Sequence, residues 1–155
     1  MSERSIVHGS FTVERHWKST PGKVFKAWAD PALKRQWFGA PEEGNPKHKF
    51  DFKVGGREFV ESPGPEGRLY TFDVRYYDIV PDNRIVYAYD MLQDGERISV
   101  SVATVEFRPD GKGTHMILTE HGAFLDGLDT VKQREEGTNF IMDQLGAWLE
   151  KQASN

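Results

Sequence analysis

Apolar and polar side chains alternate through the middle of the chain, and this two-residue period predicts antiparallel β-strands. Over residues 47–54, one face of the predicted strand carries only His48, Phe50, Phe52 and Val54. Gly55-Gly56 then predicts a tight turn into a partner strand over 57–62. A loop rich in proline, glutamate and glycine is expected just before this hairpin, over residues 40–46.

The same alternation predicts further strands, which are separated by short turn signals such as Asp94-Gly95. We expect them over residues 10–18, 68–80, 84–91, 96–108 and 114–121. In the fourth of these, the apolar positions change face near Ala103, which predicts a β-bulge there.

Helical signals flank this block of strands. Thr20-Pro21 and Asp30-Pro31 are each typical of an N-cap followed by the first residue of a helix, so two short helices are expected. A long C-terminal helix is predicted to begin at a cap formed by Asp129 or Thr130. Its apolar positions recur at helical spacing, with Phe140 and Leu149 beside the stripe of Val131, Thr138, Ile141, Leu145 and Trp148.

The order of elements indicates an α+β fold. A strongly curved antiparallel sheet of six to seven strands, wrapped around the long C-terminal helix, would bury every apolar face, with the two short helices after the first strand. We predict one domain over residues 1–155, with its core over about 10–150. Where sheet and helix separate, an apolar cavity is expected, and Gly137 predicts a close approach to the sheet or a bend over that cavity.

Composition excludes several functions. Twenty basic residues are scattered among 24 acidic ones, and the net charge of −4 argues against nucleic-acid binding. No apolar run approaches the roughly 18 residues that a membrane helix needs, and the N-terminus lacks a signal-peptide pattern. The chain has no cysteine, so disulfides and thiolate metal sites are excluded. We therefore expect a cytoplasmic protein that binds neither nucleic acid nor membranes.

Metal, phosphate and nucleophile signals are weak. His115 and His121 share a face of one strand, but six residues of strand separate them by roughly 20 Å, so they cannot share one ion. Gly55-Gly56 precedes a strand rather than a helix and is typical of a hairpin turn, not of a phosphate loop. No nucleophile elbow is present. We expect no metal and no cofactor.

The aromatic and polar residues on inward faces have two interpretations, as ordinary core or as the wall of a ligand cavity. Buried tyrosines need hydrogen-bond partners, and Ser99 or Ser101 on the next strand could supply them beside Tyr87 and Tyr89. The candidate ligand-binding residues are Trp37, Phe38, Phe50, Phe52, Tyr70, Phe72, Tyr87, Tyr89, Ser101, Glu120, Thr138 and Ile141.

Glu120 is the one candidate for a catalytic residue. It has the same strand parity as Met116 and Leu118, which places it at the expected mouth of the cavity. A desolvated carboxyl group there would have a raised pKa and could transfer protons. The alternative is a structural salt bridge or a solvent-facing side chain at the end of the strand.

Four segments resemble one known family, the activator of heat-shock-protein ATPase homologues, within the START-like (SRPBCC) helix-grip superfamily. The segments are Ser19–Phe38, Asp51–Arg57, Pro81–Tyr87 and Gly113–Gly122. The superfamily also holds polyketide cyclases and the birch-pollen allergen. The resemblance implies the helix-grip fold and brings no catalytic residue with it. Many relatives carry tryptophan after the mid-helix glycine, where this chain has Thr138.

The resemblance leaves three functions open. The first is binding of a small hydrophobic or aromatic ligand in the cavity. The second is a polyketide cyclase/aromatase-like or hydrolase-like enzyme on the same fold. The third is stimulation of a chaperone ATPase, which the lack of the additional domain found in eukaryotic relatives disfavours. The protein is expected to be a monomer or a homodimer.

Overall fold

Seven strands form one antiparallel sheet in the order β1-β7-β6-β5-β4-β3-β2 in the computed structural model, which describes residues 4–38 and 48–153. The strands are β1 (Ile6–Trp17), β2 (Lys49–Phe50), β3 (Arg57–Pro63), β4 (Leu69–Val80), β5 (Arg84–Gln93), β6 (Glu96–Asp110) and β7 (Gly113–Leu125). A 3₁₀ turn, η1 (Pro65–Gly67), connects β3 to β4. Consecutive strands from β2 to β7 are neighbours, and β1 closes the order beside β7.

Three helices complete the fold: α1 (Pro21–Ala29), α2 (Pro31–Phe38) and α3 (Val131–Ala153). Each begins at a cap that the sequence predicts. Thr20 Oγ1 accepts a hydrogen bond from the Lys23 amide at 3.4 Å, and Asp30 Oδ1 accepts one from the Ala32 amide at 2.9 Å. Thr130 Oγ1 accepts from the Gln133 amide at 3.0 Å and caps α3.

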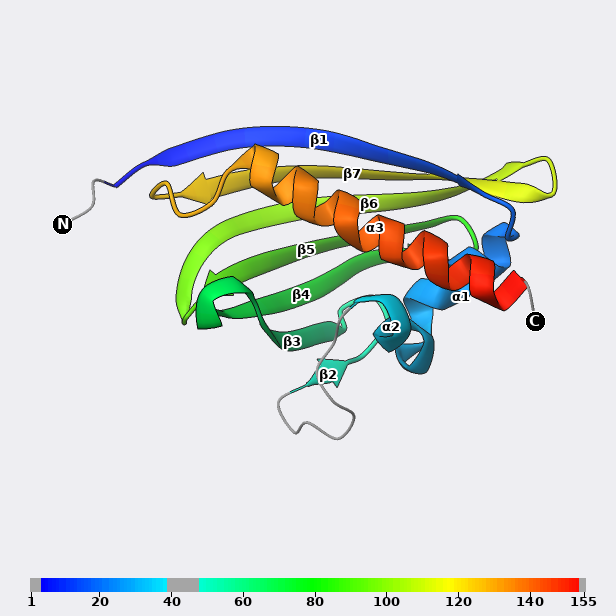
Figure 1. Cartoon of the computed structure of the whole chain (residues 1–155), viewed down its shortest axis with the longest axis horizontal. Coiled ribbons are helices and arrows are strands. Elements are labelled where there is room, and N and C mark those ends of the chain that lie inside the picture. Colours follow the sequence, from blue (N-terminus) through cyan, green and yellow to red (C-terminus); the bar gives the residue numbers. More distant parts are fainter. Residues whose placement is uncertain (1–3, 39–47, 154–155) are drawn as a thin grey trace.

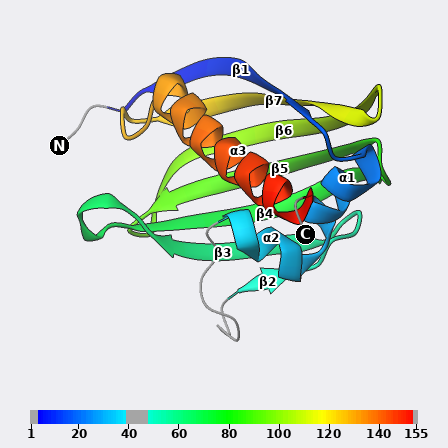
Figure 2. The same cartoon turned by 45° about the vertical axis from the view of Figure 1, so that its right-hand side comes forward.

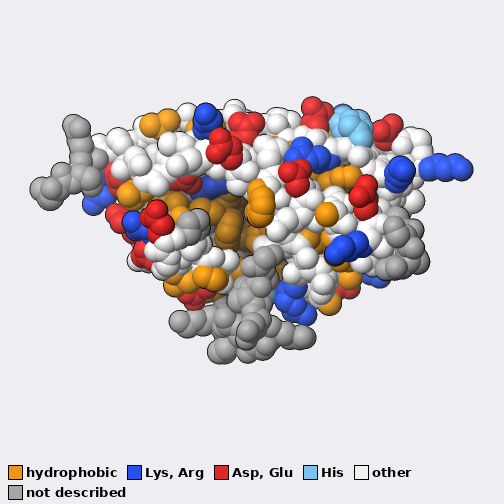
Figure 3. Space-filling model, viewed as in Figure 1, with side chains coloured by type: hydrophobic (Ala, Val, Ile, Leu, Met, Phe, Trp, Pro, Cys, Tyr) orange, Lys and Arg blue, Asp and Glu red, His pale blue; other side chains and the backbone are white. Residues whose placement is uncertain are grey.

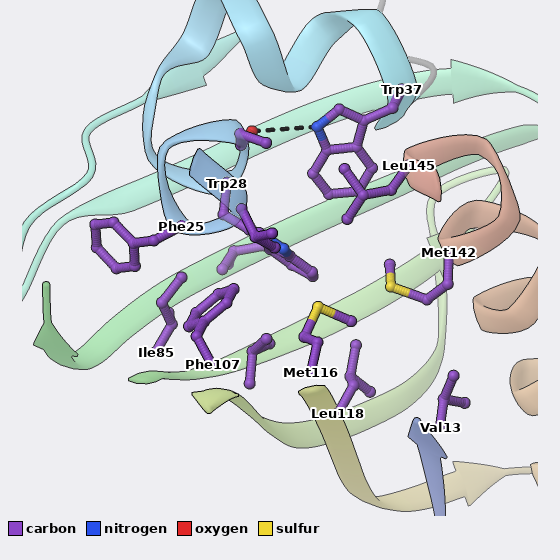
Figure 4. Close-up of a cluster of buried hydrophobic side chains, with 14 of the residues drawn as sticks. Val13, Phe25, Trp28, Trp37, Ile85, Phe107, Met116, Leu118, Met142 and Leu145 are labelled. Atoms are coloured by element: carbon purple, nitrogen blue, oxygen red, sulfur yellow. Dashed lines mark hydrogen bonds between the residues drawn. The ribbon is translucent and has the colours of Figure 1, made fainter. Parts of the chain in front are cut away.

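The sheet curves around α3, which crosses it diagonally (Figure 1), and α1 and α2 lie near the C-terminal end of that helix (Figure 2). Met142 of α3 points toward Met116 and Leu118 of β7, and Leu145 is buried in the same core (Figure 4). This is the α+β helix-grip fold, and the prediction made from the sequence is confirmed.

The helix pair closes one end of the core. Trp28 of α1 and Trp37 of α2 meet edge to face with ring centroids 5.0 Å apart, and Trp37 Nε1 donates to the Ala27 carbonyl at 3.1 Å. Phe107 of β6 packs against Phe25 and Trp28 with centroid distances of 5.6 and 6.4 Å. These rings fill the core at this end (Figure 4).

The predicted strand over 47–54 is wrong in length. Only Lys49–Phe50 pairs with β3, and the chain turns at 53–55 with Val54 exposed. The Asp51 amide donates to the Arg57 carbonyl at 2.9 Å, and a Cβ on Gly56 would lie 2.0 Å from the Asp51 carbonyl oxygen. This tight connection ends the ladder early. The predicted loop over 40–46 lies outside the described residues.

The predicted bulge near Ala103 is also misplaced. Met91 pairs with Ser99 but Leu92 pairs with Arg97, so Ile98 is the extra residue in β6. Beyond this point Ser99, Ser101 and Ala103 face inward, while Val100 and Val102 face outward and are 41% and 48% exposed. The bulge therefore brings Ser99 and Ser101 to the inner face, where a serine beside Tyr87 and Tyr89 is expected from the sequence, and turns Val100 and Val102 outward.

Close packing between helix and sheet occurs at Gly9 rather than at Gly137. A Cβ on Gly9 would lie 2.2 Å from Cγ2 of Val131, at the start of α3. A Cβ on Gly137 would meet nothing within 4 Å. The alternative prediction for Gly137 is a bend over a cavity, and Gly137 does line the cavity described below.

Candidate functional site

A cavity of about 670 Å³ lies between the sheet and α3. Its opening forms a hollow lined by hydrophobic side chains (Figure 3). The sheet provides an aromatic wall from β4 and β5, consisting of Tyr70, Phe72, Tyr87 and Tyr89. The helices provide Phe38 of α2 and Thr138, Ile141 and Met142 of α3. The cavity is thus apolar over much of its wall and has polar groups at defined places.

The alternation of side chains along β4 and β5 brings the aromatic residues of the wall to the same face of the sheet. Phe72 pairs with Met91, Val74 with Tyr89 and Tyr76 with Tyr87, so these inward side chains of two strands stand side by side. The Phe72 and Tyr89 rings are 5.5 Å apart, and the Phe38 ring reaches Phe72 at 5.6 Å. The result is a wall of neighbouring rings inclined to one another, by 32° between Phe72 and Tyr89, against which the ring of an aromatic molecule can pack.

Arg134 of α3 is the centre of a buried polar cluster that lines the cavity. Its Nη1 donates to the Tyr89 hydroxyl at 2.8 Å and lies 3.4 Å from Glu120 Oε2. The Tyr89 hydroxyl in turn donates to the same Glu120 oxygen at 2.8 Å. Ser101 of β6 also hydrogen-bonds to Glu120. The Glu120 carboxyl group of β7 is therefore connected to β5, β6 and α3.

The second terminal nitrogen of Arg134 is equally occupied. Nη2 donates to Asp129 Oδ2 at 2.6 Å and to Ser99 Oγ at 2.7 Å. The guanidinium also stacks over the rings of Tyr89 and Phe124, 5.5 and 5.4 Å from their centroids. A cation that is only 6% exposed needs such compensation, because an unpaired buried charge is very costly.

Burial is the main cause of the shifted pKa values in this cluster. Desolvation raises the pKa of Glu120 above its usual value, although the Arg134 charge and the hydrogen bonds from Tyr89, Ser101 and Arg134 oppose the rise. Desolvation likewise raises the pKa of Tyr89, and the neighbouring Glu120 adds to it. The structure therefore contains a carboxyl group, on the cavity wall, that holds its proton to a higher pH than an exposed glutamate.

A second buried ion pair lies at the α2 side of the cavity. Lys34 Nζ is 2.7 Å from Glu58 Oε1, and the Tyr76 hydroxyl donates to the same oxygen at 2.5 Å. The ammonium group also faces the rings of Phe38 and Phe50, 4.7 and 4.9 Å from their centroids. Lys34 and Glu58 both line the cavity, so its two ends carry compensated charges around an aromatic middle.

Two donors on the cavity wall have no protein acceptor within the described ranges. Trp28 Nε1 is buried without a partner. The Tyr87 hydroxyl makes no hydrogen bond to any described residue and is not sealed by protein, so it opens on the cavity. Burial, followed by the charges of Tyr89, Glu120 and Glu58, raises the pKa of Tyr87 well above its usual value, which keeps the phenol protonated.

The structure brings eight of the twelve candidate residues to the cavity wall: Phe38, Tyr70, Phe72, Tyr87, Tyr89, Glu120, Thr138 and Ile141. Ser101 lies behind Glu120 and contacts Arg134 at 3.5 Å. Trp37 packs on Trp28 in the core instead of lining the cavity. Phe50 and Phe52 pack on Tyr76 with centroids 6.2 and 5.0 Å away, because the chain turns outward after Phe50.

Sequence reasoning missed Arg134, Lys34 and Glu58. Arg134 precedes Thr138 by one helical turn and so lies on the predicted inward stripe, which was the available signal. Lys34 precedes Trp37 and Phe38 by a similar spacing on α2, so it too shares their face. Charged residues on apolar helix faces are thus the sign that would have found both pairs.

Residues 4–38 and 48–153 contain no group of three or more metal-ligating side chains placed to hold an ion. None of the helices in these ranges is long and apolar enough to cross a membrane.

Comparisons with known proteins agree with this architecture. An uncharacterised protein from Rhizobium leguminosarum is 40% identical, with a TM-score of 0.88 over 97% of this chain and 99% of that one. The protein Mll3558 from Rhizobium loti is 41% identical, with a TM-score of 0.84 over 93% and 99% of the two chains. Among the curated proteins, no significant match is found.

A more distant structure, DynU16, is described as a protein of the dynemicin biosynthetic locus. It is 17% identical, with a TM-score of 0.67 over 91% of this chain and 47% of that one, and so it shows the shared fold alone. The family model described as "Activator of Hsp90 ATPase homolog 1-like protein" matches residues 18–150, and the chain belongs to this family.

Proposed function

We propose that this protein binds a small, largely apolar, aromatic ligand in the cavity between the sheet and α3. The observation that carries the proposal is the cavity of about 670 Å³ with its continuous wall of aromatic rings on β4 and β5. Ligand sites are typically about 300–1,000 Å³ in volume and are lined by apolar side chains with a few placed polar groups.

The polar clusters support the same proposal. Apolar packing often stabilises a protein core as well as buried ion pairs do, or better. Two buried ion pairs on one cavity wall therefore indicate a role other than stability. Arg134 and Lys34 instead hold the surrounding side chains in place around the empty space. A preorganised wall reduces the side-chain entropy that the protein would otherwise lose on binding a ligand.

Filling the cavity tests the proposal directly. Thr138 lines the cavity and its hydroxyl only bonds back to the Arg134 carbonyl at 2.9 Å, so Thr138→Phe adds a ring in the cavity with little structural loss. We expect the wild type to bind the neutral dye Nile red and Thr138→Phe to bind it at least about tenfold more weakly. Ala147→Phe places the same ring on the exposed face of α3 and should bind like the wild type. Equal binding by all three proteins would contradict the proposal.

A second candidate function is acid–base catalysis on an aromatic substrate in the same cavity. The observation that favours it is Glu120, a buried carboxyl group with a raised pKa on the wall. Hydrolysis of 1-naphthyl acetate provides a simple measurement, because water cleaves the ester to naphthol and acetate. Wild-type turnover above that of Glu120→Gln would support catalysis, and equal turnover by the two proteins would argue for binding alone.

A further inference from the structure

The cationic groups of the cavity are already bound to protein partners. Both terminal nitrogens of Arg134 are occupied, by Tyr89 and Glu120 on one side and by Asp129 and Ser99 on the other. Lys34 is held by Glu58 at 2.7 Å. A ligand carboxylate entering the cavity would therefore have to displace a buried ion pair to find a cation, which is strongly unfavourable.

Acidic side chains also outnumber basic ones on the wall. Among the residues that the structure describes, Lys34 and Arg134 are the two basic residues of the wall, whereas the acidic ones are Glu58, Glu120, Asp129 and Glu136. An anion in this space would be desolvated and would meet repulsion in a medium of low dielectric constant. The charge of the wall therefore selects against acids.

The Tyr87 hydroxyl is a polar group of the aromatic wall that remains free, as does the buried Trp28 Nε1, and of these two only the hydroxyl can also accept a hydrogen bond. The Tyr87 ring stands between those of Tyr76 and Tyr89, with centroids 6.0 and 6.1 Å away, and the hydroxyl opens on the cavity without a protein partner in the described segments. A phenol can both donate and accept a hydrogen bond. It stays neutral here, since burial and the neighbouring carboxylates oppose its ionisation.

We infer that the ligand is an uncharged aromatic compound whose hydroxyl or carbonyl oxygen hydrogen-bonds to Tyr87, while its rings stack on the Phe72–Tyr89 wall. The inference rests on the proposed function and specifies its ligand class. Carboxylates are excluded by the paired cations and the acidic wall. Purely hydrocarbon compounds bind, but they leave the Tyr87 hydroxyl unsatisfied and so bind more weakly.

A matched ligand series tests the inference by calorimetric titration at pH 7 with naphthalene, 2-naphthol, 2-naphthoate and the 2-naphthylmethylammonium ion. One neutral hydrogen bond changes affinity by roughly 3- to 10-fold, so we expect the wild type to prefer 2-naphthol over naphthalene by that factor. The naphthoate should bind at least about tenfold more weakly than 2-naphthol. The ammonium ion should do so as well, because the buried carboxylates Glu58, Glu120 and Asp129 are already paired with Lys34 and Arg134 and leave no free anion for it.

Tyr87→Phe removes only the hydroxyl. We expect its affinity for naphthalene to stay within about twofold of the wild type and its preference for 2-naphthol to disappear. Tyr77→Phe is the control, since Tyr77 is 63% exposed on the same pair of strands and should keep the preference.

The possible results distinguish a failure of the inferred ligand class from a failure of the proposed binding function. Naphthalene binding by wild type and Tyr87→Phe, with the 2-naphthol preference retained in the variant, would overturn the Tyr87 assignment and leave the binding function standing. Tighter binding of the naphthoate or the ammonium ion than of 2-naphthol would overturn the neutral ligand class. Failure of all four compounds to bind the wild type would overturn the proposed function and this inference together.

Discussion

Arg134 of α3 donates a hydrogen bond of 2.8 Å to the hydroxyl of Tyr89 on β5, and this contact joins the helix to the sheet across one side of the cavity. About two to three turns farther along α3, Met142 and Leu145 pack into the apolar core (Figure 4). The helix is therefore held at two places, by a polar cluster and by apolar packing. Between them Gly137, Thr138 and Ile141 line open space.

Replacement of Arg134 should be severely destabilising. Arg134→Met keeps much of the side-chain volume but leaves Asp129 and Glu120 without their cation in a buried site. Breaking a buried ion pair from one side costs about 3–5 kcal/mol, so we expect the free energy of unfolding to fall by that amount. Urea denaturation of both proteins measures it.

Arg97→Met is the matched control for this loss. Arg97 forms a 2.9 Å pair with Asp90, but its side chain is 54% exposed. Surface pairs contribute about 0–1 kcal/mol, so this variant should unfold almost like the wild type. Equal losses of unfolding free energy in the two variants would show that the buried Arg134 cluster stabilises the fold no more than a surface ion pair does.

The Lys34–Glu58 pair should show strong coupling between its members. Lys34→Met leaves Glu58 buried with only Tyr76 as a donor, and we expect a loss of about 3 kcal/mol in unfolding free energy. Adding Glu58→Gln removes the unpaired charge while retaining an acceptor for the Tyr76 hydroxyl. The double variant should therefore be more stable than Lys34→Met alone. Additive losses in a double-mutant cycle would contradict this prediction.

Strand alternation made much of the cavity wall predictable. The two-residue period assigns Tyr87, Tyr89 and Glu120 to inward faces without any knowledge of tertiary structure, and all three line the cavity. Alternation does not reveal which inward residues meet ligand space and which pack on one another. Phe52 shares the predicted face of Phe50, and both rings pack on Tyr76 instead of lining the cavity.

The same reasoning named Tyr89, Ser101 and Glu120 but not Arg134, the charged residue that connects them. The helical period was read from apolar positions, so Arg134 was passed over although it lies on the same face as Thr138. Its acceptors Ser99 and Ser101 face inward because of the bulge at Ile98, and Val100 and Val102 had pointed to another register. A single inserted residue thus moves the side chains of the following strand segment to the opposite face of the sheet. The position of the inserted residue is seen only from the pairing with the neighbouring strand.

Gly137 and Gly9 should respond oppositely to substitution by alanine. A Cβ on Gly137 meets nothing, and alanine is the better helix former by about 0.5–1 kcal/mol, so Gly137→Ala should raise the free energy of unfolding by that amount. A Cβ on Gly9 would collide with Val131, so Gly9→Ala should lower it by about 1–3 kcal/mol. Thermal denaturation compares both variants with the wild type.

Val131→Ala provides the control for Gly9. Removing the two Cγ methyl groups makes room for the new Cβ, so Gly9→Ala should cost much less in the Val131→Ala background than in the wild type. An equal cost in both backgrounds would show that the loss arises elsewhere than in this contact.

The buried carboxyl of Glu120 should give the protein a stability that declines as pH rises. Its folded pKa lies above the usual value of 4.5, because desolvation outweighs the opposing Arg134 charge. Between 4.5 and the folded pKa, the folded state keeps a proton that the unfolded state has released, so raising the pH through this window favours unfolding. Glu120→Gln cannot titrate. The difference in unfolding free energy, wild type minus variant, should therefore fall with pH above 4.5 and become constant above the folded pKa.

Urea denaturation of both proteins in steps from pH 4 to pH 8 measures this difference. Glu96→Gln, at an exposed glutamate that begins β6, provides the comparison, and its difference from the wild type should not show the same decline. The Tyr89 and Arg134 partners remain in Glu120→Gln, so their contribution largely cancels in the subtraction. Parallel pH profiles for the wild type and Glu120→Gln would mean that the Glu120 carboxyl does not hold its proton above its usual range. They would also remove the main support for an acid–base role at this position.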